Sequence, residues 1–342
     1  MARAVPTQTY TKSARSRTLL AAALLVAGLV LIICLSLTSG SISLTWQEFW
    51  LALTHQGDST HQTIIWQLRL PRVLAALTVG AALGMSGALL QGMLRNGLAS
   101  PFLLGISSGA GLVAVLMVAL GVWQGWLPLG TWLGGVGTLI IVYGLARTGN
   151  SISIQRLILG GVAFSTLSGA VQSMLLLTAR EGRVQAALTW LLGSLNGRGW
   201  EEVSIIGPGV AVALVLGCLL ARQLNLLSLG EDLAMGLGVS LLRSRLMIGA
   251  VAAFLAAGAV SIAGLVGFVG LIVPHGIRLL VGADNRLVLP FSALGGALVL
   301  STADLLARIG PIELPVGIVT ALMGSPVFIW LLYRRSAVLT GV

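Results

Sequence analysis

Residues 19–37 read LLAAALLVAGLVLIICLSL, a run of nineteen residues without a charged side chain. A helix of about 20 apolar residues crosses the roughly 30 Å hydrocarbon core of a bilayer, so this run predicts a membrane-spanning helix. Arg15 and Arg17 stand just before it, as cationic residues do in a signal peptide. The apolar core of a signal peptide is only about 7–15 residues long, and the greater length of this run favours a retained span.

The composition of the whole chain points to the same class of protein. Of 342 residues, 56% are hydrophobic and only 9% are charged, with a mean hydropathy of +0.99. Soluble globular domains carry about 25% charged residues, so this chain cannot cover a surface that faces water. A cytosolic enzyme, a disordered segment and a disulfide scaffold are excluded, and the long apolar runs disfavour a β-barrel. We therefore predict an all-α polytopic membrane protein.

Nine further spans are predicted from the remaining charge-free runs. The stretches 96–146 and 246–277 are each too long for one helix. We expect the first to break at 121–130, which reads GVWQGWLPLG, and the second within its glycine-rich centre, 264–270. The short run 184–197 is interpreted as an interfacial helix. The ten predicted spans are 19–37, 73–94, two within 96–146, 157–179, 203–221, two within 246–277, 287–307 and 314–333.

The basic residues predict how the chain is oriented. With ten spans and a cytoplasmic N-terminus, fourteen of the 20 Lys and Arg residues fall on the cytoplasmic side. Cytoplasmic loops of membrane proteins carry such an excess, so both termini are expected inside. The net charge of +10 is scattered between apolar blocks rather than gathered on one face, which disfavours nucleic-acid binding. We predict one domain, 1–342, with a cytoplasmic tail, 1–17, and a cytoplasmic segment, 223–244.

The spans carry no evident energy source for transport. Secondary transporters place acidic residues or histidines in the membrane to hold ions, whereas the middles of these spans are uncharged. Lys12 is the chain's one lysine, and no phosphate-binding Gly-x-x-x-x-Gly-Lys-Ser/Thr loop occurs. An ATP-driven role would therefore need a separate ATPase chain. A secondary transporter and a membrane scaffold remain the alternatives.

No catalytic or metal-binding residue set is expected. The two cysteines, Cys34 and Cys218, lie inside apolar runs and form no Cys-x-x-Cys pair. Pairs of glycines four residues apart, such as Gly80 and Gly84, predict close packing of helices in lipid. The alternative interpretation of such a pair is a gating hinge.

The segment 223–244 is the longest polar stretch on the predicted cytoplasmic side. Ser228 or Gly230 could cap a short helix whose first turn holds Glu231 and Asp232, and Gly238 could end it. Acidic residues are favourable at a helix N-terminus. Such a helix could dock into a groove on a partner, or it could be a solvated surface helix.

Several long blocks of the sequence resemble the FecCD family, the permease subunits of ABC importers for ferric siderophores, haem and cobalamin. The resemblance covers nearly the whole chain after residue 40 and is specific for the family rather than for a cargo. The main blocks are LRLPRVLAALTVGAALGMSGALLQGMLRNGLASPFLLGISSGAG at 68–111, LGEDLAMGLGV at 229–239, GFVGLIVPHGIRLLVGADNRLVLP at 267–290 and ADLLARIGPIELPVGIVTALMGSPVFIWLL at 303–332.

This resemblance implies the ABC type II importer fold, with ten spans per subunit and two permease subunits around a shared path. It implies two ATP-binding subunits below and a substrate-binding protein above. The second permease would be the same chain or a relative. The chain would hold no cofactor of its own, because ATP and Mg²⁺ belong to the partner ATPase.

The resemblance also assigns roles to arginines on the outer face. In the family, outer arginines receive acidic residues of the binding protein, and the matching positions here are Arg69, Arg72 and Arg308. Arginine can pair with a carboxylate through two parallel hydrogen bonds. Anchoring to lipid headgroups is the alternative role for Arg69 and Arg72.

On the inner face, the resemblance implies a coupling helix and a gate. The coupling positions that match are Gly230, Glu231, Asp232, Ala234, Leu237 and Gly238. The cytoplasmic gate positions are Asn96, Leu98, Ile154 and Gln155. Two departures affect the gate: Gly97 stands where the family usually has proline, and Ile154 is apolar where the cobalamin member has hydroxyl residues.

The resemblance favours a ferric siderophore as cargo, because most of the family carries one, while cobalamin and haem stay open. The expected location is the bacterial inner membrane.

Overall fold

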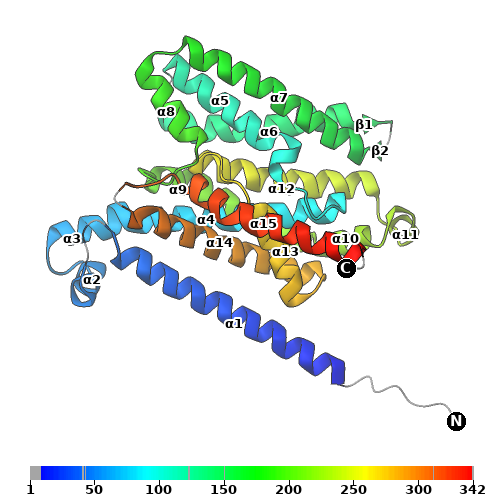
Figure 1. Ribbon diagram of the computed structural model, residues 1–342, viewed down its shortest axis with the longest axis horizontal. Coiled ribbons are helices and arrows are strands. Elements are labelled where there is room, and N and C mark those ends of the chain that lie inside the picture. The colour runs from blue at the N-terminus through cyan, green and yellow to red at the C-terminus, as the bar shows by residue number, and fades with distance from the viewer. Residues whose placement is uncertain are drawn as a thin grey trace.

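The computed structural model describes residues 9–40, 42, 44–121, 124–149, 151–310 and 312–340, nearly all of them helical (Figure 1). The helices of the first half are α1 (Thr9–Thr38), α2 (Trp46–Leu53), α3 (Ser59–Thr63), the π-helix η1 (Ile64–Arg69), α4 (Leu70–Leu94), the 3₁₀-helix η2 (Pro101–Leu104), α5 (Ile106–Leu120), η3 (Gln124–Trp126) and α6 (Leu127–Ala146). A hairpin of β1 (Arg147–Thr148) and β2 (Ser151–Ile152) follows. The second half holds α7 (Ile154–Thr178), α8 (Glu181–Leu191), α9 (Trp200–Leu219), α10 (Ala221–Ser228), α11 (Glu231–Gly236), α12 (Leu241–Ala263), α13 (Val269–Val281), α14 (Asn285–Ile309) and α15 (Val316–Thr340).

The predicted breaks within the two long apolar stretches are confirmed. The first falls between α5 and α6, where Pro128 stands at the start of α6 and fixes a backbone angle suited to a first turn. The second falls between α12 and α13, where Gly264 adopts a positive φ of 70°. The helix predicted within 184–197 corresponds to α8, which begins three residues earlier, at Glu181, and ends at Leu191.

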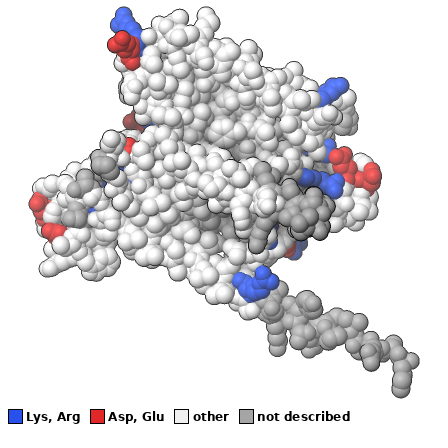
Figure 2. All heavy atoms as spheres, viewed as in Figure 1, with Lys and Arg blue, Asp and Glu red and all other residues white. Residues whose placement is uncertain are grey.

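Seven helices in the described part of the chain are long and apolar enough to cross a membrane. They are α1 (from Ser16), the continuous stretch from α3 through α4 (Ser59–Leu94), α6, α7, α9, α12 and α14. Three shorter apolar helices are α5, α13 and the Val316–Trp330 part of α15. Figure 2 shows most charged side chains toward the left and right of the molecule and one basic group near the start of α1, with a nearly uncharged surface between them. The protein is therefore a multi-pass membrane protein.

The helices stack in a fixed order across the bundle (Figure 1). α4 and α12 form the buried centre, with α14 and α13 against one side of α4 and with α5 and α6 against the other side of α12. α7 covers α5 and α6, and α1 lies at the opposite edge against α14. Few of the described residues of α1 and α7 are buried, as expected of helices that face lipid or another subunit.

The two ends of the bundle carry different elements. α2, α3 and α8 lie at one end, whereas α10, α11 and the hairpin lie at the other. α1 begins and α15 ends at this second end (Figure 1). Of the predicted tail, residues 1–8 lie outside the described residues, and from Thr9 the chain is already part of α1.

The glycine pair in α4 packs helices together, as predicted. At Gly84, a side-chain Cβ would overlap the carbonyl oxygen of Ser292 on α14, and at Gly80 it would overlap that of Gly296. These glycines let the two backbones touch, which explains why α4 and α14 are the most closely packed pair.

We expect Gly84→Ala to lower thermal stability, because overpacking a tight contact costs about 1–3 kcal/mol. Gly137→Ala in α6 is the matched control, since a Cβ there would meet nothing within 4 Å. That exchange removes the helix penalty of glycine, about 1 kcal/mol, and should leave stability equal or higher. Thermal unfolding of both variants in detergent checks this, and equal melting temperatures would contradict the packing role.

Candidate functional sites at the two ends of the bundle

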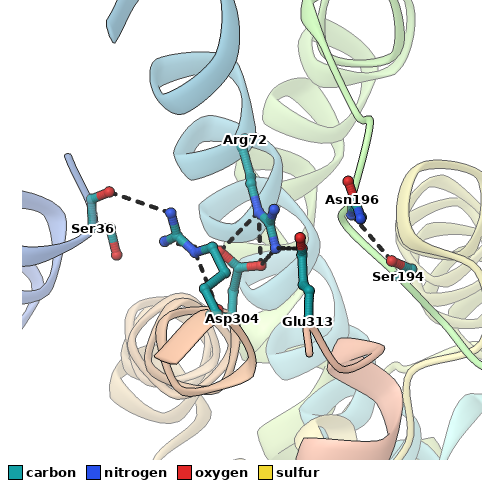
Figure 3. A network of polar contacts seen from close by, with 7 residues as sticks. Ser36, Arg72, Ser194, Asn196, Asp304 and Glu313 are labelled. Atoms are coloured by element: carbon teal, nitrogen blue, oxygen red, sulfur yellow. Dashed lines mark hydrogen bonds and ion pairs between the residues drawn. The ribbon is translucent and has the colours of Figure 1, made fainter. Parts of the chain in front are cut away.

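A four-residue ion cluster closes the end of the bundle that carries α2 and α3. Arg72 on α4 lies between Asp304 on α14 and Glu313 in the loop before α15, at 2.7 and 2.6 Å (Figure 3). Arg308, one turn after Asp304, binds the other carboxylate oxygen at 3.1 Å. We call these four residues the Arg72 cluster. It ties α4, α14 and the following loop to one another.

The members of the Arg72 cluster differ in how far they are buried. The Asp304 side chain is 1% exposed and receives both arginines, whereas Glu313 is 33% exposed and holds only Arg72. A buried carboxylate needs such pairing, because desolvation of an unpaired charge costs several kcal/mol. Asp304 is therefore the structural centre of the cluster, and Glu313 is its solvent-facing member.

Arg69 lies beside the cluster but is bound to backbone. Its Nη1 donates to the carbonyl oxygen of Leu37 at 2.7 Å, and its Nη2 donates to that of Ile42. These bonds satisfy carbonyl groups near the end of α1 and in the loop that follows. Arg69 is buried as a result.

The structure gathers the three predicted docking arginines at one pocket. This pocket measures about 650 Å³ and is lined by Arg69, Arg72 and Arg308 together with Glu313. The guanidinium groups already bind partners within the chain, so an incoming acidic residue would have to join or displace those partners. The sequence did not predict Glu313 as a residue of this site. Its position five residues after Arg308 is the one sequence feature that could have suggested it.

The opposite end of the bundle presents α11. Gly230 and Gly238 flank it with positive φ angles of 116° and 82°, which only glycine adopts readily. Ala234 is buried against the bundle, and three apolar side chains around it are exposed. These exposed side chains are Leu233, Met235 and Leu237. The helix predicted from Glu231 is therefore confirmed, and α10 directly before it was not predicted.

A polar contact fixes α10 beneath α14. The Asn225 amide donates to Asp284 at 2.6 Å, and its oxygen accepts from the Asn285 backbone at 2.9 Å. Asp284 caps α14, and the backbone N–H of Arg286 together with the Asn225 amide lowers the pKa of its carboxyl. The start of α14 thus anchors the segment that leads into α11.

The predicted gate residues lie at two helix ends on this side. Asn96 follows α4, where its side-chain oxygen accepts from the Leu98 backbone at 2.9 Å and closes a tight turn. Gly97 has open space around it and an ordinary φ, so glycine is not required by the turn. Ile154 and Gln155 are the first residues of α7. η2, which follows the Asn96 turn, packs against α7 and connects the two parts.

Comparison with known proteins identifies the family. The FecCD transport family matches residues 28–334. The chain belongs to the FecCD transport family. A chain of this family is a permease subunit of an ABC importer, which is the coarse function that the sequence blocks predicted.

Relatives of this FecCD chain act on different cargoes. The hemin transport system permease protein HmuU of Yersinia pestis is 39% identical over 90% of this chain and 94% of its own. The cobalamin import system permease protein BtuC of Halobacterium salinarum is 44% identical over 81% and 75%. The Fe(3+) dicitrate transport system permease protein FecD of Escherichia coli is 42% identical over 88% and 94%.

A solved structure agrees with the fold of this FecCD chain. It is described as an inward-facing metal-chelate type ABC transporter, is 36% identical, and covers 91% of this chain and 97% of its own with a TM-score of 0.83. The relatives are permease subunits and not enzymes themselves. Family membership implies an ATPase, a substrate-binding protein and a second permease subunit as partners.

Proposed function

We propose that this FecCD permease imports an iron(III)–siderophore complex across the bacterial inner membrane. The observation that carries the proposal is the match, over 88% of this chain, to a permease named for ferric dicitrate, an iron(III) chelate. Hemin and cobalamin are the alternative cargoes, since relatives of similar identity are named for them.

The proposed topology has ten spans with both termini in the cytoplasm. Seven long helices and three shorter apolar ones of the described chain supply ten candidates. The start of α1, the end of α15 and α11 share one end of the bundle, which supports a common cytoplasmic side. The excess of basic residues there agrees.

The proposed path runs along the exposed face of α7, opposite a second permease subunit. Leu159, Thr166, Ser173 and Leu177 lie on this face at helical spacing and are exposed. The face is uncharged, as suits a path without ion coupling. The partner permease is a second copy of this chain or a relative.

The proposed motor is a pair of ATPase subunits, one of them bound at α11. Gly230 and Gly238 flank this helix and Ala234 is buried against the bundle. Leu237 and Asp232 are exposed, and Glu231 is partly exposed while it pairs with Arg245. The cytoplasmic gate is assigned to the Asn96 turn with Leu98, and to Ile154 and Gln155 at the start of α7. ATP and Mg²⁺ are used by the partner ATPase.

The binding protein is proposed to dock at the pocket lined by the three arginines. In the free permease, Glu313 forms an ion pair with Arg72 at this pocket. We expect Glu313→Gln to remove the acidic competitor at Arg72, which keeps its pairing with Asp304, and so to favour an acidic residue of the binding protein there. A rim ion pair contributes about 0–1 kcal/mol, so docking should tighten up to about five-fold. The gain should shrink at high salt.

Surface plasmon resonance with the permease in nanodiscs measures this docking. The wild type and Glu313→Gln are compared at low and high ionic strength. Unchanged or weaker docking of Glu313→Gln would contradict a docking role for Arg72.

The cargo is tested on the intact complex purified from native membrane. Mass spectrometry identifies each subunit, including the second permease. After reconstitution with ATP, uptake of a ferric hydroxamate siderophore, hemin and cyanocobalamin is measured in parallel. We expect uptake of the siderophore, and uptake of hemin or cobalamin alone would overturn the proposed cargo.

A further inference from the structure

One buried arginine joins three elements at the end of the bundle that carries α11. Arg245 lies in the first turns of α12 and is 6% exposed. Its Nη2 binds Glu231 Oε1 on α11 at 2.6 Å, and its Nη1 donates to the carbonyl oxygen of Ile152 at 3.0 Å. The Tyr143 hydroxyl of α6 donates to the backbone carbonyl of Arg245 at 3.0 Å.

The two guanidinium contacts connect the proposed ATPase-binding helix α11 with the hairpin that leads into α7. Glu231 is the first residue of α11, the segment assigned to the ATPase. Ile152 ends the hairpin, and Ser153 caps α7 by accepting a hydrogen bond from the Arg156 backbone. The Arg245 side chain therefore links the first residue of α11 to Ile152, which lies two residues before the start of α7.

The chemistry of arginine suits a rigid connection. Its guanidinium is planar and always charged, and it holds its donors in a fixed fork, whereas lysine is a point charge on a flexible stem. The helix α11 is otherwise held mainly by its buried Ala234, while half of the Glu231 side chain is exposed, at 47%. Tyr143 and the packing of α12 hold the backbone of Arg245, and the contacts to Glu231 and Ile152 hold its guanidinium.

We infer that Arg245 is a positioning residue that transmits movement of α11 to the hairpin and the start of α7. This inference rests on the proposed function, in which an ATPase moves α11 and α7 borders the path. Arg245 contacts neither cargo nor nucleotide in this scheme. It makes α11, β2 and the first turn of α7 move as one body.

The first test measures coupling in the reconstituted complex. Arg245→Lys keeps the charge but loses the fork, so uptake per ATP hydrolysed should fall roughly ten-fold while ATP hydrolysis continues. Arg243→Gln is the control, because Arg243 is an exposed cation on the same helix, and it should keep the wild-type ratio. An unchanged uptake per ATP in Arg245→Lys, whether or not both rates fall, would overturn the inference.

The second test does not depend on cargo. Spin labels at Met235 of α11 and Arg147 of β1, in a chain without Cys34 and Cys218, report the distance between helix and hairpin. In the wild type this distance should stay constant between nucleotide-free and ATP-bound complexes. It should change in Arg245→Lys and also in Glu231→Ala, which removes the acceptor of the contact to α11 and leaves the contact to Ile152 in place.

Equal behaviour of the wild type and both variants in the label experiment would overturn the link. Failure of the proposed function has a different signature, because the wild-type complex would then take up no ferric siderophore while the label distances still report on Arg245.

Discussion

Exchanging Leu233 and Leu237 together for aspartate should weaken binding of the ATPase subunit by at least about 100-fold, with the permease still folded. Both side chains are largely exposed, one on α11 and one directly after it, so the exchange should cost the permease little stability. Burying a leucine stabilises by about 1.5–3 kcal/mol, and two of them account for at least about 3 kcal/mol of binding free energy. Affinity of the purified ATPase for the permease in nanodiscs measures the effect.

Ile312→Asp is the matched control for the α11 variant. Ile312 is also an exposed aliphatic residue, but it lies in the loop at the opposite end of the bundle. ATPase affinity of this control should equal that of the wild type. If the α11 variant also kept full affinity, α11 would not be the docking helix.

Replacing Asp304 with alanine should destabilise the fold by about 3–5 kcal/mol, because removing one partner of a buried ion pair leaves an uncompensated charge. Here two arginines lose their shared carboxylate, and Arg72 and Arg308 are only 13% and 10% exposed. Their mutual repulsion would then be balanced by Glu313 alone. Chemical unfolding in detergent measures the change in the free energy of unfolding.

Glu313→Ala separates the buried contact from the exposed one. Glu313 pairs with Arg72 at the rim, where an ion pair contributes about 0–1 kcal/mol, so this variant should unfold close to the wild type. Similar losses for Asp304→Ala and Glu313→Ala would show that Asp304 is not the centre of the cluster.

The helices could be predicted because their signal is local. A charge-free run of sufficient length, a proline at 128 and the glycines at 264–270 each act on their own few residues. The short helix from Glu231 could be predicted for the same reason, since its flanking glycines and first-turn acids are adjacent in sequence. The π-helix η1 and the two-residue strands carry no comparable pattern.

The partners of the polar side chains could not be predicted from sequence. Arg72 and Asp304 are separated by 232 positions, and Arg245 and Ile152 by 93. Such pairs arise only when the packing of α4 on α14, or of α12 beside the hairpin, brings them together. Family resemblance marked Arg69, Arg72 and Arg308, yet it did not reveal that backbone carbonyls and internal acids already bind them.

We propose that this permease is an uncharged passage moved from its inner face by an ATPase. Accumulation of a ferric siderophore is measured in liposomes that hold the permease alone and in liposomes that hold the full complex, each with and without ATP. Accumulation against the gradient should occur only in the full complex with ATP, and a proton uncoupler should leave it intact. If the permease alone concentrated the chelate without nucleotide, an ATPase would not be what drives it.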